Sequence, residues 1–215
     1  MHIHHGLDHI PKRVSWIIGI DEAGRGPVAG PLTVGLVMIK RTHIEEVQTK
    51  LPLVRDSKKL SPRKRESVIE DAIDLEKSST IIVRTIFTDA CVIDTQGISQ
   101  CLYQSIEEGL QELIEYTSVD RKSIFVYLDG SLKAPQGYRQ QTVTGGDNKI
   151  FSIALASIYA KVARDKVMEQ YDIRYPAYDF YAHKGYGTVA HMKNIKTHGL
   201  CPIHRRSFLK KIVDK

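Results

Sequence analysis

Acidic residues occur at three places in this 215-residue chain where an apolar stretch begins or ends, and together they have the chemistry of a metal site. They are Asp21, Glu22, Asp129 and Asp147. Neighbouring carboxylates raise each other's pKa unless a cation compensates them, and their hard oxygen atoms suit Mg²⁺ or Mn²⁺. Because the chain lacks the Ser-His or Cys-His spacing of a nucleophilic enzyme, the pattern favours metal-assisted phosphoryl transfer.

Each acid also has a simpler structural explanation. The Asp21-Glu22 pair is typical of a polar turn at a strand end, and Asp129 with Gly130 is typical of an Asp-Gly turn. Asp147 has the preferred type for a helix N-cap, a role that would weaken its contact with a metal. Neighbours on a regular strand point to opposite faces, so Asp21 and Glu22 serve one site only if the strand ends or bends there.

Hydrophobic periodicity predicts the strands and helices that would position these acids. We expect buried strands over residues 16–21, 32–39, 80–87 and 124–128. We expect helices over residues 62–75, 99–116 and 149–171, the first of them with Ser61 as its N-cap and Pro62 at its first position. These elements predict an α/β fold, a mixed sheet flanked by helices, with a basic and aromatic tail around it.

Three other segments have residue types that suit a nucleic-acid backbone. Ser57 and Lys58 lie at the mouth of a predicted helix, where backbone N–H groups also attract anions. Tyr186 lies between two glycines and would present a flat ring to a sugar or a base. The arginines of segment 202–208 would clamp phosphates. The alternatives are a solvated helix start, a surface loop with a packed tyrosine, and a second solvated helix.

Composition indicates the class of partner and the compartment. A formal net charge of +6 and a pI of about 9.1 fit a polyanion, although a merely basic protein has the same balance. Cys91, Cys101 and Cys201 form no C-x-x-C pair, which favours a reducing compartment, and Cys201 with His204 would make only half of a zinc site. No apolar run approaches the ~18 residues of a membrane span, and the N-terminus lacks a signal peptide's apolar stretch, so we expect a cytoplasmic protein without membrane contact.

Six segments, in order from about residue 17 to residue 208, resemble the sequence blocks of ribonuclease HII, the type II ribonuclease H family. The blocks are 21–31 (with Asp-Glu-Ala-Gly-Arg-Gly-Pro and Ala-Gly-Pro), 56–61 (Asp-Ser-Lys-Lys-Leu-Ser), 129–130, 152–165, 183–188 and 202–208. The resemblance implies an RNase H-like fold with a small helical C-terminal part that binds substrate. We accordingly expect a flexible segment at 1–14, a catalytic core at 15–174 and a substrate-binding region at 175–215, in a monomeric protein.

The resemblance also implies the reaction and the residues that perform it. Members hydrolyse the RNA strand of RNA–DNA hybrids and cut 5′ to ribonucleotides embedded in duplex DNA, leaving 3′-hydroxyl and 5′-phosphate ends. Two divalent ions, Mn²⁺ or Mg²⁺, are implied as cofactors. The implied catalytic residues and metal ligands are Asp21, Glu22, Asp129 and Asp147. The implied substrate-binding residues are Gly24, Arg25, Gly26, Ser57, Lys58 and Tyr186.

Two departures from the family pattern lie near these residues. Gly145 replaces a lysine that usually stands two residues before the fourth acid, and Gly97 replaces an asparagine that usually contacts the nucleic acid. Two other functions fit parts of the sequence. A nucleotide-binding protein would use Gly24-x-Gly26-x-x-x-Gly30, although that spacing misses G-x-G-x-x-G. A hybrid-binding protein without activity would keep the same surface and lose the chemistry.

Overall fold

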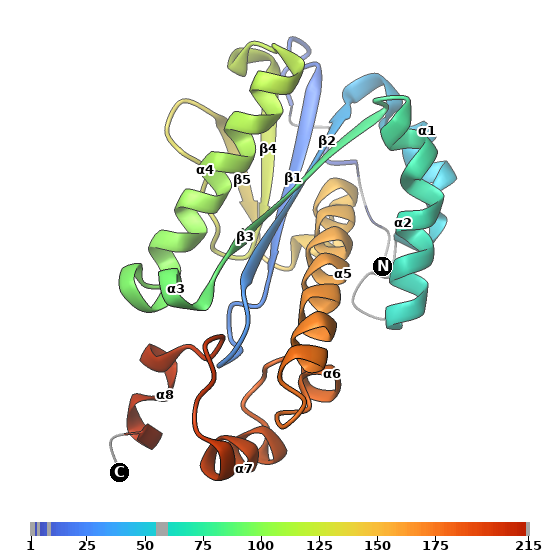
Figure 1. The fold of residues 1–215 in the computed structure, drawn as a ribbon. Helices are drawn as coiled ribbons and strands as arrows, with labels where there is room; N and C mark the ends of the chain where they lie inside the picture. Colours follow the sequence, from blue (N-terminus) through green and yellow to red (C-terminus); the bar gives the residue numbers. More distant parts are fainter. Residues whose placement is uncertain (1–2, 4, 8–9, 55–59, 214–215) are drawn as a thin grey trace.

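A five-stranded mixed sheet forms the centre of the molecule, and helices cover both of its faces (Figure 1). The computed structural model describes residues 3, 5–7, 10–54 and 60–213. The strands are β1 (Trp16–Ala23), β2 (Leu32–Lys40), β3 (Ile81–Thr88), β4 (Ile124–Asp129) and β5 (Arg139–Val143), in the spatial order β3-β2-β1-β4-β5. Because β1 is parallel to β4, the carboxyl ends of these two strands lie at the same edge of the sheet.

The helices divide between the two faces. They are α1 (Ile44–Lys50), α2 (Pro62–Lys77), α3 (Ala90–Gln96), α4 (Ile98–Thr117), α5 (Phe151–Arg174), α6 (Phe180–His183), α7 (Val189–His198) and α8 (Arg206–Val213), with 3₁₀ turns η1 (Arg41–His43), η3 (Arg121–Ser123) and η4 (Gly146–Asn148). One hydrophobic cluster joins α1, α2 and α5 to one face of the sheet, and a second joins α3 and α4 to the other. The sheet is therefore buried on both sides, which explains why its central strands are apolar at nearly every position.

Two glycines allow α5 to lie unusually close to the sheet. A Cβ atom at Gly19 would overlap the backbone of Ser152, and one at Gly35 would overlap the carbonyl of Ala156. This close approach holds the N-terminal part of α5 against β1 and β2.

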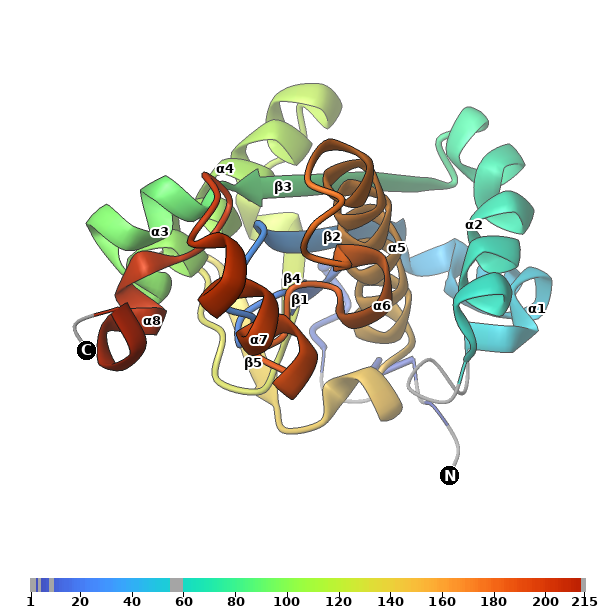
Figure 2. The same cartoon turned by 60° about the horizontal axis from the view of Figure 1, so that its bottom comes forward.

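The chain after α5 forms a third hydrophobic cluster at one end of the sheet. It packs against the loop between β1 and β2, where Ala29 forms a β-bridge with His204. Figure 2 shows α6, α7 and α8 gathered at this end of the molecule, below α5 in Figure 1. The C-terminal segment thus lies next to the loop that follows the first acids, as the α/β architecture alone does not require.

The four predicted strands and three predicted helices are confirmed with shifts at their ends, as is the mixed sheet flanked by helices. The predicted end of the first strand at Asp21 is wrong, because β1 continues to Ala23, which pairs with Thr33 of β2. Ser61 caps α2 as predicted and accepts a hydrogen bond from the Lys64 amide at 3.4 Å. The short helices α1 and α3 and the strand β5 were not predicted. None of the described helices has the length and hydropathy needed to cross a membrane.

Candidate active site

The carboxyl ends of β1 and β4 bring two of the predicted acids together. The last residue pair between the two strands is Ile20 with Leu128, so Asp21 and Asp129 follow at the same level. A carboxylate oxygen of Asp129 accepts a hydrogen bond from the backbone N–H of Gly146. Asp129 therefore holds the start of η4 at the end of β4, and Asp147 is the next residue in that turn.

Asp21 lies in an environment that opposes its ionisation. Its side chain is buried, and burial raises the pKa of Asp21 to about 7, with the charges of Glu22 and Asp129 adding to the increase. Hydrogen bonds from the Ser157 hydroxyl and from the Glu22 amide, the latter at 2.8 Å, act in the opposite direction on the pKa. Burial also raises the pKa of Glu22, Arg25 lowers it, and Asp129 raises it further. The charge of Asp129 therefore acts on both Asp21 and Glu22.

The charge of Asp129 acts on Glu22 although the strand does not end at Asp21. The Asp21 carboxylate accepts a hydrogen bond from the N–H of Glu22, so the Asp21 side chain leans forward along the chain. The Glu22 side chain is 16% exposed, and its carboxylate lies 3.6 Å from a guanidinium nitrogen of Arg25. The strand thus does not end at Asp21, although the charge of Asp129 raises the pKa of both acids.

Asp147 is buried inside η4, and its predicted role as a helix cap is wrong. The N-cap of α5 is Ile150, three residues further along the chain. A carboxylate oxygen of Asp147 accepts a hydrogen bond from the side-chain amide of Asn148 at 3.1 Å. The intervening 3₁₀ turn separates Asp147 from the start of the helix, so capping does not compete with a metal for this carboxylate.

The acids fit a divalent cation without forming a closed cage. In the described part of the chain, no three Asp, Glu, His or Cys side chains converge as closely as a finished metal site requires. The pKa of Asp21 is nevertheless raised by burial and by the charges of Glu22 and Asp129, and the pKa of Glu22 is raised by burial and by the charge of Asp129. A hard cation would offset that repulsion, and carboxylate oxygens are the donors that Mg²⁺ and Mn²⁺ prefer.

A cleft of about 490 Å³ opens beside the acids and joins residues that are far apart in the sequence. It is lined by Glu22, Ala23, Gly24, Arg25, Gly26, Arg65, Lys161, Arg164, Asp165, Ala182, His183, Lys184 and Tyr186. Four of the six predicted substrate-binding residues are among them. The other two, Ser57 and Lys58, lie outside the described residues.

Two buried arginines hold the loop that carries Gly24, Arg25 and Gly26. Arg205 is fully buried and donates to the carbonyls of Gly24 (2.7 Å), Arg25 (3.2 Å) and Gly30 (3.0 Å). Arg164 donates to three further carbonyls, those of Ala29, Pro31 and Lys184. Among the described residues, neither guanidinium forms an ion pair with a carboxylate. The predicted phosphate clamp is therefore wrong for Arg205, whose hydrogen bonds all shape the loop.

The glycines of this loop differ in their backbone conformation and in the space around them. Gly24 has a φ of +84°, and a Cβ atom there would lie 2.5 Å from the carbonyl oxygen of Pro31. A Cβ atom at Gly26 would meet nothing within 4 Å, although Gly26 lines the cleft. Gly30 faces the sulfur atom of Met168 and its carbonyl binds Arg205, so it does not present its backbone to a ligand. This arrangement does not support the nucleotide-binding alternative.

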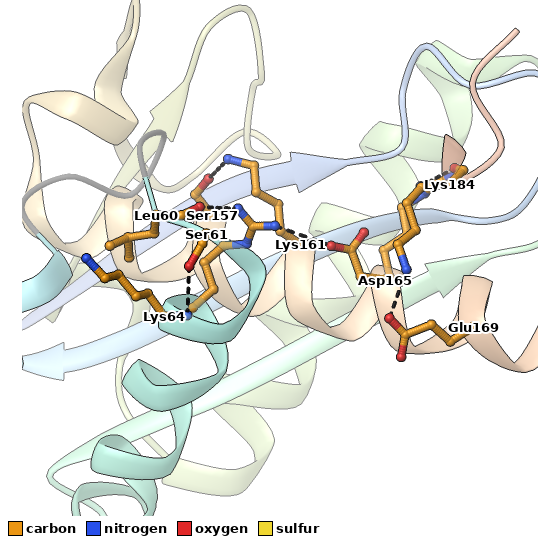
Figure 3. Close-up of polar contacts among 10 residues, drawn as sticks. Leu60, Ser61, Lys64, Ser157, Lys161, Asp165, Glu169 and Lys184 are labelled. Atoms are coloured by element: carbon orange, nitrogen blue, oxygen red, sulfur yellow. Dashed lines mark hydrogen bonds and ion pairs between the residues drawn. The ribbon is translucent and has the colours of Figure 1, made fainter. Parts of the chain in front are cut away.

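Sequence reasoning assigned no individual role to the polar residues of α5 and α2 that line the cleft. Lys161 donates to the Ser157 hydroxyl at 2.8 Å (Figure 3). The Ser157 hydroxyl in turn forms a hydrogen bond with Asp21. Arg65 pairs with Asp165 at 3.4 Å and donates to the carbonyl of Leu60 at 2.7 Å. The signal was present, because positions 157, 161 and 165 repeat every four residues and so share one face of a helix.

The chain is similar to known proteins of one family. The family model described as Ribonuclease HII matches residues 18–211. A Ribonuclease HII of Caldicellulosiruptor bescii is 38% identical over 199 residues, covering 93% of this chain and 89% of the relative. A Ribonuclease HII of Geotalea uraniireducens is 41% identical over 192 residues, covering 89% and 82%.

Solved structures share the fold at low sequence identity. The ribonuclease H2 of Pyrococcus horikoshii superposes with a TM-score of 0.67 at 24% identity, covering 93% of this chain and 97% of that protein. The RNase HII of Archaeoglobus fulgidus, solved in complex with PCNA, gives a TM-score of 0.68 at 24% identity, covering 91% and 94%. Bst-RNase HIII, solved with Mn²⁺, gives 0.63 at 18% identity, covering 92% and 66%.

Proposed function

Because the chain belongs to the ribonuclease HII family, and is thus a metal-dependent endonuclease acting on RNA–DNA hybrids, we propose that it also cuts duplex DNA 5′ to single embedded ribonucleotides. The products would carry 3′-hydroxyl and 5′-phosphate ends. The observation that supports this proposal is the composition of the cleft. Glu22, the Gly24–Gly26 loop and Tyr186 line the same cavity although up to 164 residues of sequence separate them.

Asp21, Glu22, Asp129 and Asp147 would hold the divalent ions. A pair of Mg²⁺ or Mn²⁺ ions supplies an activated water and stabilises the leaving 3′ oxygen when bound to such a carboxylate set. The chain's own part is to keep negative charge concentrated at the sheet edge. Burial of Asp21 beside Glu22 and Asp129 does this, because the repulsion that raises the pKa of Asp21 is relieved when a cation binds.

The loop after β1 would distinguish RNA from DNA. A protein tells the two apart at a given position through the 2′-hydroxyl group. The open side of Gly26 leaves room for a sugar to approach the backbone closely, and Gly24 supplies a turn that no other residue fits without strain. A site that hydrogen-bonds a substrate hydroxyl rejects the analogue that lacks it by several orders of magnitude in rate.

Basic residues that line the cleft would hold the phosphate backbone. Lys161, Arg65 and Lys184 line the same cavity as Glu22. Lys161 is also linked to Asp21 through the Ser157 hydroxyl, so this lysine lies close to the acids. Ammonium and guanidinium groups at such positions bind phosphate oxygens by charge-assisted hydrogen bonds.

Cleavage of defined duplexes tests the proposal. Purified protein with Mg²⁺ or Mn²⁺ is expected to cut a DNA duplex that contains one ribonucleotide, on its 5′ side, and to leave the matched all-DNA duplex intact. A long RNA–DNA hybrid serves as the control for the general activity of the family, and a chelator is expected to stop both reactions. Cleavage of the hybrid without cleavage of the single-ribonucleotide duplex would refute junction recognition, and a protein that binds both duplexes without cutting would instead be a non-catalytic hybrid binder.

A further inference from the structure

Three histidines are buried together next to the cleft, which one of them, His183, lines, and the proposed reaction does not use them. His183, His191 and His204 all belong to the C-terminal segment that packs on the Gly24–Gly26 loop. The rings of His183 and His191 stack with their centroids 4.1 Å apart. The Nε2 atoms of His191 and His204 lie 3.0 Å from each other.

The hydrogen bonds assign one tautomer to each ring of the linked pair. The Cys201 backbone N–H donates to Nδ1 of His204 at 2.9 Å, so this nitrogen carries no proton and Nε2 carries it. Nε2–H of His204 then donates to Nε2 of His191. His191 must therefore carry its proton on Nδ1, which donates to the carbonyl oxygen of Tyr186 at 2.9 Å.

This chain of bonds requires both rings to be neutral. Burial lowers the pKa of His191 to about 4 and also lowers the pKa of His204. The titratable groups that face the pair are His183, Arg206, Cys201 and Tyr178, none of which supplies a negative charge near neutral pH. His183 is fixed separately, since it accepts from the Gly185 N–H and donates to the Tyr178 carbonyl.

The chain ends on the backbone of the aromatic residue that lines the cleft. The carbonyl oxygen of Tyr186 accepts from His191 and from the Thr188 amide, and its N–H donates to the carbonyl of His183 at 2.9 Å. The residue as a whole is 53% exposed. Tyr186 thus has a fixed backbone and a side chain that is free to contact a ligand.

We propose that His191 and His204 are positioning residues for Tyr186, which link the Cys201 turn to the Tyr186 carbonyl and hold the tyrosine ring against the ribonucleotide in the cleft. The idea deepens the proposed function and rests on it for the identity of the ligand. The rings never touch the substrate. They act because two hydrogen bonds to the Tyr186 carbonyl fix the backbone of this residue, and the backbone sets the position and direction of its side chain in the cleft.

The tautomers can be measured without any activity. Nitrogen-15 NMR of histidine-labelled protein at neutral pH is expected to show His204 protonated on Nε2 only and His191 protonated on Nδ1 only. The reverse tautomer in either ring, or a charged imidazolium at pH 7, overturns the proposal. This result does not depend on cleavage, so it separates failure of the histidine chain from failure of the proposed function.

A matched pair of substitutions tests the effect on Tyr186. His191→Asn and His191→Leu have nearly the same shape and leave the same space, but only asparagine keeps a donor near the position of Nδ1. For the single-ribonucleotide duplex we expect His191→Leu to raise KM about five- to tenfold with kcat little changed, and His191→Asn to recover most of that loss. Equal KM values for the two variants would overturn the proposal, since a purely structural role affects both alike.

A double-mutant cycle identifies the route of the effect. In the Tyr186→Ala background, His191→Leu is expected to have no further influence on KM, because the side chain that it positions is absent. If the two effects multiply instead, His191 acts through another group and the proposal fails. Independently of turnover, the Tyr186 amide resonance is expected to shift in His191→Leu and to stay near its original position in His191→Asn; equal shifts would count against the proposal.

Discussion

The acidic edge of the sheet and the histidine cluster of the C-terminal segment both contain buried ionisable groups. The neutral form that burial favours suits the role of the histidines and opposes the role of the acids. It raises the pKa of Asp21 to about 7 and lowers the pKa of His191 to about 4, so in each case it favours the neutral form. The histidines use that neutral form, because their ring nitrogens are hydrogen-bonded as neutral donors and acceptors. The acids need the charged form to bind a cation.

This difference distinguishes the acids, which would take part in the reaction, from the C-terminal segment, which holds the loops of the cleft in place. At the acidic edge the repulsion between neighbouring carboxylates is not compensated in the protein alone, and a bound cation would compensate it. In the C-terminal segment, by contrast, Arg205 and His191 already donate hydrogen bonds to backbone carbonyls and need no added ion. The comparison predicts that changes at the acids affect turnover and metal binding, whereas changes in the C-terminal segment affect loop shape and stability.

Asp129→Asn should produce the largest effect and should confine it to turnover. Removing one charge from the acid set is expected to lower kcat on the order of 10³-fold, while substrate binding remains, because the cleft walls are unchanged. Single-turnover cleavage and a binding titration in Ca²⁺ measure the two quantities. Full activity of this variant would exclude Asp129 from the site.

Arg205→Met tests the supporting role of the C-terminal segment. The variant loses three hydrogen bonds to backbone carbonyls, and we expect the free energy of unfolding to fall by about 3 kcal/mol. Arg206→Met is the matched control, because its side chain is exposed and adjacent in sequence. Denaturant unfolding of both variants measures the difference. Equal stabilities would mean that the carbonyl contacts of Arg205 contribute nothing.

Asp21→Asn is expected to stabilise the metal-free protein. The pKa of Asp21 is higher in the folded state than its model value of 3.8, so its contribution to stability is present at low pH and is lost as pH rises from about 4 to 7. Asparagine removes that loss, and at pH 7.5 in chelator we expect a gain of about 2 kcal/mol, or about 5 °C in Tm. The gain should vanish at pH 4.

The pH dependence of stability that His191 contributes runs in the opposite direction to that of Asp21, so it provides an internal control. The pKa of His191 is lower in the folded state than the model value of 6.5, so its contribution is present above pH 6.5 and is lost as pH falls toward 4. The Asp21→Asn variant should keep this acid-side loss unchanged. A loss of stability on the alkaline side that persists in Asp21→Asn would contradict the assignment to Asp21.

Gly26→Ala should have the smallest effect and leave the fold unchanged. A Cβ atom there meets no protein atom within 4 Å, so Tm is expected to stay the same. Because the added methyl group would occupy space in the cleft, KM for the single-ribonucleotide duplex is expected to rise about tenfold. Steady-state kinetics with a parallel thermal melt decide the matter. An unchanged KM would show that substrate does not approach the backbone at this position.

Prediction from the sequence succeeded where the signal is local. The apolar runs before Asp21 and Asp129 identified β1 and β4, because a strand buried on both faces must be hydrophobic at nearly every position. Strand β5 was not predicted, since it is a polar edge strand with exposed residues between Arg139 and Val143. The alternative role of Asp147 as a helix cap stayed open because a short 3₁₀ turn leaves no distinct pattern in the sequence.

The sequence by itself determined which residues carry charge to the ends of the strands and which positions require glycine, since both follow from short-range hydrophobic pattern and backbone sterics. Only the tertiary structure decided what Arg205, His191 and His204 do. Their partners lie up to 181 residues away, and the same residue types on a solvated surface would bind phosphate or titrate near neutral pH. Burial against backbone carbonyls turns them into supports instead, because a buried polar group must find a partner and the nearest ones belong to the loops that shape the cleft.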